Sequence, residues 1–169
     1  MNNSAFLTNY LQLIVNPSEE EIAAFQDRIS YSEITKGTRL IKIEERCDKI
    51  YFVLDGYLKF VMDIDGKDVV IHISGRGNLV TDFYSYYSLK PAISSVYAIT
   101  DCQLACVQRK DLEELFSRYK VWEKFGRIVA EQAAVRLIFE KINLQTKSNE
   151  ERYLKLLSER PELLQHSKL

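Results

Sequence analysis

The sequence predicts an α+β fold: an antiparallel β-roll of the jelly-roll (double-stranded β-helix) type, with short helices before it and one long helix after it. Three observations support this prediction. Apolar residues keep helical spacing up to about Ile29, then alternate with polar residues between Tyr31 and Val107 in runs broken by turns that contain glycine. The stretch from Val121 to Ile142 returns to helical spacing for about six turns, with no proline and one glycine.

Two short helices are expected before the roll. Residues 4–14 place apolar side chains on one helical side, and Asn16-Pro17 ends this helix. Ser18 and Glu21 have the spacing of a capping box, in which each side chain accepts from the main-chain N–H of the other residue. A second helix should therefore begin here and run to about Ile29.

Short strands separated by turns are expected to form the roll. About seven or eight short strands with frequent turns are typical of a sandwich or a barrel-like roll. Asp55-Gly56 and Asp65-Gly66 are the strongest hairpin signals, because glycine accepts the positive φ of a tight turn. The expected strands are Tyr31–Ile34, Leu40–Ile43, Ile50–Leu54, Tyr57–Met62, Val69–Ile73, Ser94–Ile99 and Gln103–Val107.

The segment Gly75–Ser95 interrupts these strands and is too apolar for a solvent-exposed loop. Thr81-Asp82 predicts the start of a short helix from Phe83 to Tyr87, since aspartate and threonine are preferred N-cap residues. The free amides of a helix N-terminus inside a roll favour an anion. Any ligand is therefore expected in this segment.

A short helix over Lys110–Tyr119 should lead into the long helix. One series of residues along the long helix recurs at alternating spacings of four and three, and all but Gln132 are apolar, which is typical of a helix that pairs with another. A second stripe, of mostly small residues, lies on the other side. We expect one face to pack on the rest of the chain and the other on a second copy, giving a homodimer; the alternative is a central helix in a monomeric core. The predicted dimer interface is Val121, Phe125, Ile128, Gln132, Val135, Phe139 and Ile142.

The composition is that of an ordinary globular protein, with 46% apolar and 28% charged residues and a net charge of −1. It shows no basic footprint for nucleic acid, no apolar run long enough to span a membrane and no secretory leader. Three cysteines (Cys47, Cys102 and Cys106) cannot all pair, which favours reduced thiols in the cytoplasm. With His72 and His166 as the two histidines, we expect no metal site, no cofactor and no enzyme.

The order of elements resembles the cyclic-nucleotide-binding sensor domain of the Crp/Fnr family of bacterial transcription regulators, over nearly the whole chain. Two stretches carry the resemblance. IYFVLDGYLKF (Ile50–Phe60) has Gly56 at the family's turn glycine, and NEERYLKLLSERPELL (Asn149–Leu164) is similar to the segment that leads into the helix-turn-helix. The cysteine cluster that an iron–sulfur centre of the Fnr branch needs is missing from the sequence.

The candidate ligand site departs from the family's nucleotide-binding pattern. In that pattern the short helix begins with Gly-Glu and the next strand carries Arg-Ser or Arg-Thr, where glutamate holds the ribose and arginine neutralises the cyclic phosphate. Here Thr81-Asp82 takes the place of Gly-Glu, and no arginine occurs from Leu79 to Val107, so we expect no response to cyclic AMP. Tyr84, Tyr86 and Tyr87 either line a pocket for a flatter, less charged ligand or fill the nucleotide's space. An unidentified small-molecule effector, if one binds, should contact Thr81, Asp82, Tyr84, Ser94 and Ser95.

The sequence predicts three regions. Residues 1–118 form the roll with its N-terminal helices, residues 119–146 form the dimerisation helix, and residues 147–169 begin a truncated DNA-binding region. Pro161–Gln165 looks like the edge of an unfinished helical bundle, so DNA would be read only by a C-terminal region outside this chain. The predicted function is the sensor and dimerisation part of a Crp/Fnr-like DNA-binding regulator. The alternative is a stand-alone small-molecule-binding or protein-interaction roll.

Overall fold

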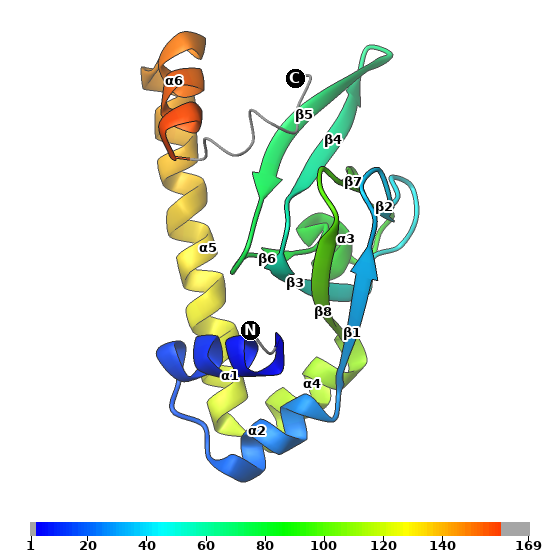
Figure 1. Cartoon of the computed structure of the whole chain (residues 1–169), viewed down its shortest axis with the longest axis vertical. Helices are drawn as coiled ribbons and strands as arrows, with labels where there is room; N and C mark the ends of the chain where they lie inside the picture. The colour runs from blue at the N-terminus through cyan, green and yellow to red at the C-terminus, as the bar shows by residue number, and fades with distance from the viewer. Residues whose placement is uncertain (1–2, 160–169) are drawn as a thin grey trace. The chain divides into compact units, whose positions relative to one another are not determined.

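The computed structural model describes residues 3–159, which divide between Glu123 and Lys124 into two compact units. The first unit contains two antiparallel four-stranded sheets with strand orders β1-β8-β3-β6 and β2-β7-β4-β5 (Figure 1). Its strands are β1 (Ile29–Ile34), β2 (Arg39–Ile41), β3 (Lys49–Asp55), β4 (Leu58–Ile64), β5 (Lys67–Ser74), β6 (Leu79–Val80), β7 (Ser95–Ala98) and β8 (Cys102–Gln108). This architecture confirms the predicted α+β roll.

The core of the roll is formed by apolar residues of both sheets. Val53 of β3 and Leu104 of β8 come from one sheet, whereas Leu58 of β4 and Val96 of β7 come from the other, and all four side chains are inaccessible to solvent. Alternation along a strand sends every second side chain inward, which is why the period of two in the sequence identified these segments. Cys102 belongs to the same cluster, and the three cysteines are free and buried.

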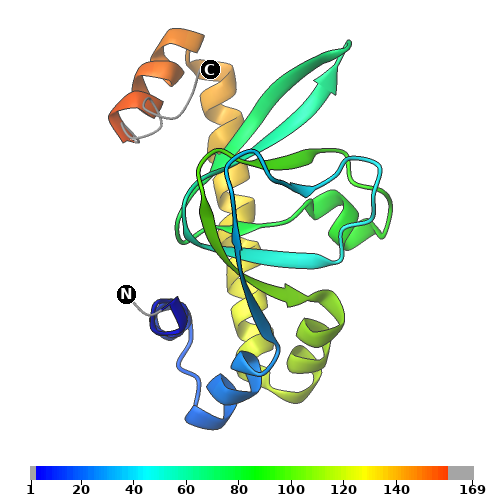
Figure 2. The ribbon, with the colours of Figure 1, turned by 45° about the vertical axis from the view of Figure 1, so that its right-hand side comes forward.

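The two Asp-Gly turns behave differently. Asp65-Gly66 closes the β4–β5 hairpin, which extends beyond the rest of the roll in Figure 2, so that prediction is confirmed. The prediction of a hairpin at Asp55-Gly56 is wrong, because β3 and β4 belong to different sheets. Gly56 has a φ of 88° and turns the chain from one sheet to the other, so the glycine has the expected backbone angle without joining paired strands.

The N-terminal helices α1 (Asn3–Ile14) and α2 (Glu19–Gln26) were both predicted, and the capping box of Ser18 and Glu21 is present. The helix α2 ends at Gln26 rather than near Ile29, where β1 already begins. On α1 the apolar side contacts the roll: the ring of Tyr10 lies 4.6 Å from that of Phe52 on β3.

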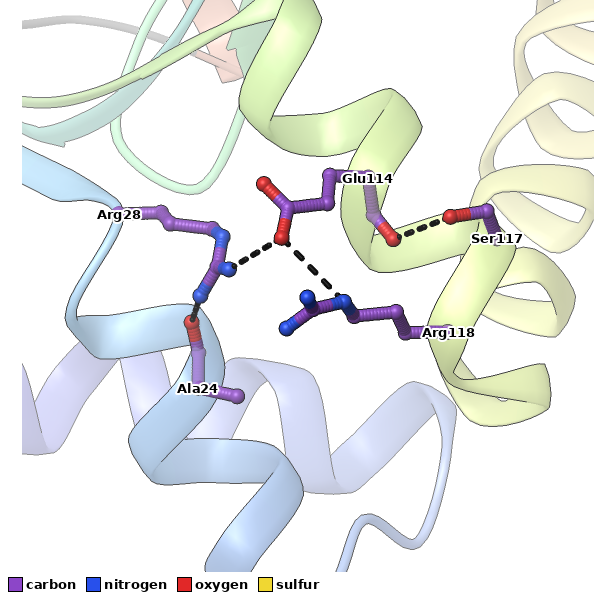
Figure 3. Close-up of polar contacts among 5 residues, drawn as sticks. All are labelled: Ala24, Arg28, Glu114, Ser117 and Arg118. Carbon is purple, nitrogen blue, oxygen red and sulfur yellow. Dashed lines mark hydrogen bonds and ion pairs between the residues drawn. The ribbon is translucent and has the colours of Figure 1, made fainter.

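A cluster of charged residues fastens α2 to α4 (Arg109–Arg118), as Figure 3 shows. Arg28 donates to the main-chain oxygen of Ala24 at 2.9 Å and to the carboxylate of Glu114 at 3.0 Å. Arg118 approaches the same carboxylate at 3.3 Å. The Glu114 carboxylate on α4 thus holds Arg118 of the same helix and Arg28, which lies between α2 and β1, and this connects the end of α2 to α4.

The long helix α5 (Lys120–Thr146) has 27 residues and is followed by α6 (Asn149–Glu159). At its start, Trp122 is inaccessible to solvent and its ring lies 4.8 Å from that of Phe25 on α2. Ser148 and Glu151 form the expected second capping box at the start of α6, with bonds of 2.8 and 3.2 Å. The segment Pro161–Gln165, which we interpreted as the edge of a bundle, lies outside the described residues. None of the helices in residues 3–159 is long and apolar enough to cross a membrane.

Candidate functional site

The short helix α3 (Phe83–Ser88) lies between β6 and β7, as the Thr81-Asp82 pair predicts. Asp82 is the N-cap residue: its backbone is extended, and its Oδ1 atom accepts from the main-chain N–H of Ser85 at 2.8 Å. The helix ends at Leu89, which has a left-handed φ of 62° and donates its N–H to the main-chain oxygen of Ser85. This left-handed backbone lets the chain leave the helix after a turn and a half.

The second carboxylate oxygen of Asp82 is bound by the loop that follows α3. Oδ2 accepts from the main-chain N–H groups of Ile93 and Ser94, both at 3.1 Å, and from the hydroxyl of Ser94 at 2.9 Å. The Asp82 and Ser94 residues are 3% and 4% exposed. The structure therefore brings these two predicted ligand residues together, but their side chains bind each other and the backbone.

Thr81 and Ser95 flank this pair in the sequence and bind the backbone of β3 and of the turn after β2, respectively. The hydroxyl of Thr81 donates to the main-chain oxygen of Lys49 at 2.8 Å, and that of Ser95 accepts from the N–H of Ile43 at 3.0 Å. Both residues are buried. Of the five predicted ligand residues, Thr81 and Ser95 therefore bond the rest of the roll, whereas Asp82 and Ser94 bond within the segment. Ligand binding by these residues stays a prediction.

Sequence reasoning missed Ser85, which is completely buried in α3. Its hydroxyl donates to the main-chain oxygen of Lys90 at 2.6 Å and accepts from the N–H of Cys47 at 2.8 Å. A serine inside a run of aromatic residues carries no signal for such contacts, because Cys47 lies 38 residues earlier in the chain.

The three tyrosines of α3 do not act as one group. Tyr84 and Tyr87 are 44% and 64% exposed, and the ring of Tyr87 stacks on that of Phe83 with the centroids 6.2 Å apart. Tyr86 is the buried one, and burial raises the pKa of its phenol to about 12. Tyr84 and Tyr87 therefore do not fill an interior space, so that expectation is wrong for these two residues; whether the tyrosines line a ligand pocket stays a prediction.

An arginine does contact this segment, although it lies two residues beyond the stretch Leu79–Val107. Arg109, the first residue of α4, donates to the main-chain oxygen of Tyr86, and its guanidinium carbon lies 5.3 Å from the centre of the Tyr86 ring. Its Nε atom bonds the carboxylate of Glu113 at 2.7 Å, which raises the pKa of the guanidinium. Arg109 therefore links α3 to α4.

The residues of the predicted dimer interface on α5 become more exposed to solvent toward the C-terminal end of the helix. Val121 and Ile128 are partly buried and Phe125 is buried, whereas Gln132 is exposed. The last three positions, Val135, Phe139 and Ile142, are 53%, 63% and 47% exposed. The dimer interface and the alternative of a central helix in a monomeric core both stay predictions.

A shallow hollow follows the exposed part of the interface. Its volume is about 590 Å³, and it is lined by Ile128, Glu131, Gln132, Val135, Arg136 and Phe139. Leu137, Ile138 and Leu144 are further exposed apolar residues on the same helix. Neighbouring exposed apolar residues such as Val135 and Phe139 are typical of interaction surfaces.

The part of the chain that the structure describes contains no group of three or more histidine, cysteine, aspartate or glutamate side chains able to hold a metal ion. Cys102 and Cys106 are buried, and desolvation raises the pKa of both thiols. A raised thiol pKa keeps the sulfur protonated at neutral pH, which disfavours both metal binding and nucleophilic attack.

Comparison with solved structures identifies the same architecture in several proteins. The chain is similar to a cyclic nucleotide-binding domain from Methylobacillus flagellatus (TM-score 0.70, 17% identity, covering 86% of this chain and 87% of that one). It is also similar to the c-di-GMP-responsive global regulator CLP of Xanthomonas campestris (TM-score 0.67, 19% identity, 86% and 74% covered). A third is the sensor domain of the transcriptional regulator DNR from Pseudomonas aeruginosa (TM-score 0.64, 14% identity, 88% and 99% covered).

At these identities the structural likeness shows the fold alone, and no curated protein sequence matches this chain significantly. The family model of the cyclic nucleotide-binding domain matches residues 31–119, from β1 to the end of α4, and so covers more than half of the chain. This match includes both sheets, the short helix α3 and the loop that binds Asp82. The chain therefore belongs to the cyclic nucleotide-binding domain family.

Proposed function

We propose that this chain is the sensor and dimerisation part of a Crp/Fnr-like DNA-binding transcription regulator of the bacterial cytoplasm, one that does not respond to cyclic AMP. The observation that carries the proposal is a cyclic nucleotide-binding fold continued by a 27-residue helix with an exposed apolar side. Two of the similar structures are described as a global regulator and as the sensor domain of a transcriptional regulator, which supports this reading.

Dimerisation is supported by the exposed part of the α5 interface. Val135 and Phe139 are more than half exposed in the single chain, and burying such side chains releases roughly 1.5–3 kcal/mol each. Their spacing is that of a helix pair, and a twofold axis would place each side chain against the same surface of a second copy. A second copy of this chain is therefore the partner we propose for α5.

Insensitivity to cyclic AMP is supported by two features of the segment around α3. A buried phosphate needs a cation, and no arginine occurs from Leu79 to Val107. Asp82, at the place where the resembling nucleotide-binding proteins use glutamate for the ribose, is fully engaged in bonds to Ser85, Ile93 and Ser94. Arg109, which does contact α3, is held by Tyr86 and Glu113.

DNA binding in this proposal requires more than the described residues. A helix-turn-helix uses two helices, the second of which enters the major groove. The described residues after α5 supply α6. We therefore propose that a region C-terminal to this chain completes the DNA-reading unit.

A mobility-shift assay with genomic fragments tests the function. The natural gene product should select fragments that contain a roughly twofold-symmetric operator, whereas residues 1–169 alone should show no sequence preference. Cyclic AMP and cyclic GMP, added at millimolar concentration, should leave the shift unchanged. A natural product that binds no fragment at micromolar concentration, or a shift that depends on cyclic AMP, would contradict the proposal.

The second candidate is a stand-alone binding roll. It is favoured by the aromatic surface of α3, where Phe83, Tyr84 and Tyr87 are 45%, 44% and 64% exposed. Aromatic residues are enriched in protein interfaces. If the natural gene product is a dimer but binds none of the DNA fragments in the mobility-shift assay, we would propose this second function instead.

A further inference from the structure

The most heavily bonded buried side chain near α3 is the carboxylate of Asp82, and its bonding exceeds what a helix cap requires. An N-cap aspartate needs one oxygen to accept from the first turn of the helix, and Oδ1 does so with Ser85. The three donors on Oδ2 come instead from Ile93 and Ser94, which lie 11 and 12 residues later in the chain. Capping therefore explains one of the four bonds.

The three donors on Oδ2 form a site for a single oxyanion oxygen. Two main-chain N–H groups and one hydroxyl converge on one point from within 3.1 Å, where Asp82 and Ser94 are buried and the side chain of Ile93 is exposed. Hydrogen bonds from several donors to one charged oxygen are stronger than bonds between neutral groups. The same arrangement would accept an oxygen of a carboxylate or of a phosphate.

We propose that Asp82 acts as an internal ligand of the roll: its Oδ2 atom occupies an oxyanion site formed by Ile93 and Ser94, and thereby holds α3 and the following loop together without an external effector. The proposal rests on the geometry of residues 82–94 and holds whether or not the protein binds DNA. It extends the proposed function, because the Asp82 carboxylate would keep α3 and the following loop in one conformation when no nucleotide is bound.

If the Asp82 carboxylate is removed, the donors of Ile93 and Ser94 should bind a small oxyanion instead. Two variants of the full chain remove it. Asp82→Ala removes the whole carboxylate, whereas Asp82→Ser retains an oxygen that can cap α3 but leaves the donors of Ile93 and Ser94 empty. The matched control is Asp63→Ala, since Asp63 accepts from the main-chain N–H of Gly66 at 2.8 Å in the exposed β4–β5 turn.

Thermal unfolding with sodium formate, sodium acetate or inorganic phosphate gives the readout, against sodium chloride at equal ionic strength. Loss of a buried, multiply bonded carboxylate should lower the melting temperature of Asp82→Ala by about 10 °C, and Asp63→Ala should change it by about 2 °C or less. Formate should raise the melting temperature of both Asp82 variants in a saturable way, and should not raise that of the wild type or of Asp63→Ala. If none of the three anions raises it above the chloride value, the proposal is overturned.

Amide hydrogen exchange of the wild-type protein keeps the proposal testable if the Asp82 variants do not fold. The N–H groups of Ile93 and Ser94 lie in a loop without strand pairing, so their protection depends on Asp82. They should exchange as slowly as the amides of the neighbouring strands. Exchange at the rate of a free loop would contradict a permanently occupied site.

Discussion

Arg109 binds Tyr86 in two ways at once, through the main-chain oxygen and through the face of the ring. The two residues are 23 positions apart, on α4 and α3, and Glu113 fixes the guanidinium from the other side with a bond of 2.7 Å. A planar guanidinium can donate and stack at the same time, which a lysine cannot do. Arg109 therefore connects the candidate sensor segment to α4.

Replacing Arg109 should loosen α3. We expect Arg109→Ala and Arg109→Lys each to speed up amide hydrogen exchange at Leu89, whose N–H bonds to Ser85 at the end of α3, by several-fold. Arg118→Ala is the control, since Arg118 pairs with Glu114 on the side of α4 that faces α2. Unchanged exchange at Leu89 in Arg109→Ala would show that the contact does not restrain α3.

Stability should fall at high pH, and Tyr86 should account for part of the fall. Burial raises the pKa of Tyr86 from 10.0 to about 12. Because the folded-state pKa is the higher one, this contribution to stability is complete below pH 10 and is lost as the pH rises toward 12. Urea unfolding of Tyr86→Phe should therefore show a smaller loss between pH 10 and pH 12 than the wild type. Parallel losses in the two proteins would contradict this assignment.

Most elements of the fold could be predicted from the sequence, because each has a pattern of neighbouring residues that is typical of a helix or a strand. The capping boxes of Ser18 and Ser148 predicted two helix starts, and the spacing between Val121 and Ile142 predicted α5. The missed strand, β6, has two residues and is too short to show alternation. The two Asp-Gly pairs look alike in the sequence, but one joins strands of different sheets and the other joins paired strands. This difference depends on contacts between residues far apart in the chain.

The candidate site could be located from the sequence but not interpreted. Thr81, Asp82, Ser94 and Ser95 are polar residues in an apolar segment, which marks them as special. Whether such side chains face a ligand or each other depends on how the chain folds back between α3 and β7. The bonds from Ile93 and Ser94 to Asp82 are set by that tertiary packing, and Arg109 contacts the segment from another element.

Gly56 should be far less tolerant of substitution than Gly66. Both follow an aspartate and both have positive φ, at 88° and 77°. A Cβ on Gly56 would collide with the main-chain oxygen of Asp101 and lie 2.7 Å from Sγ of Cys102, whereas one on Gly66 would meet nothing within 4 Å. We expect Gly56→Ala to lower the free energy of unfolding by about 3 kcal/mol or more, and Gly66→Ala by about 1 kcal/mol. Urea unfolding measures both values, and equal losses would mean that crowding at Gly56 is relieved by small shifts.

The homodimer can be tested at the exposed end of the α5 interface. Phe139 is 63% exposed in the single chain and lines the hollow next to Val135. In a twofold dimer Phe139→Asp would bring two carboxylates into an apolar contact, and we expect the dissociation constant to rise about 100-fold, equivalent to about 2.8 kcal/mol. Light scattering at tens of micromolar should then give a mass of about 19.7 kDa for the variant and about twice that for the wild type.

The matched control for this test is Ala134→Asp, which introduces the same charge at an exposed position on a different side of the helix. It should remain dimeric, because that side does not belong to the predicted interface. Circular dichroism should show that both variants keep the helical content of the wild type, so that a change in mass reports association rather than unfolding. A wild-type chain that is monomeric at these concentrations, or an Ala134→Asp variant that dissociates as readily as Phe139→Asp, would rule out the proposed interface, since its specificity rests on the side of α5 that carries Val135 and Phe139.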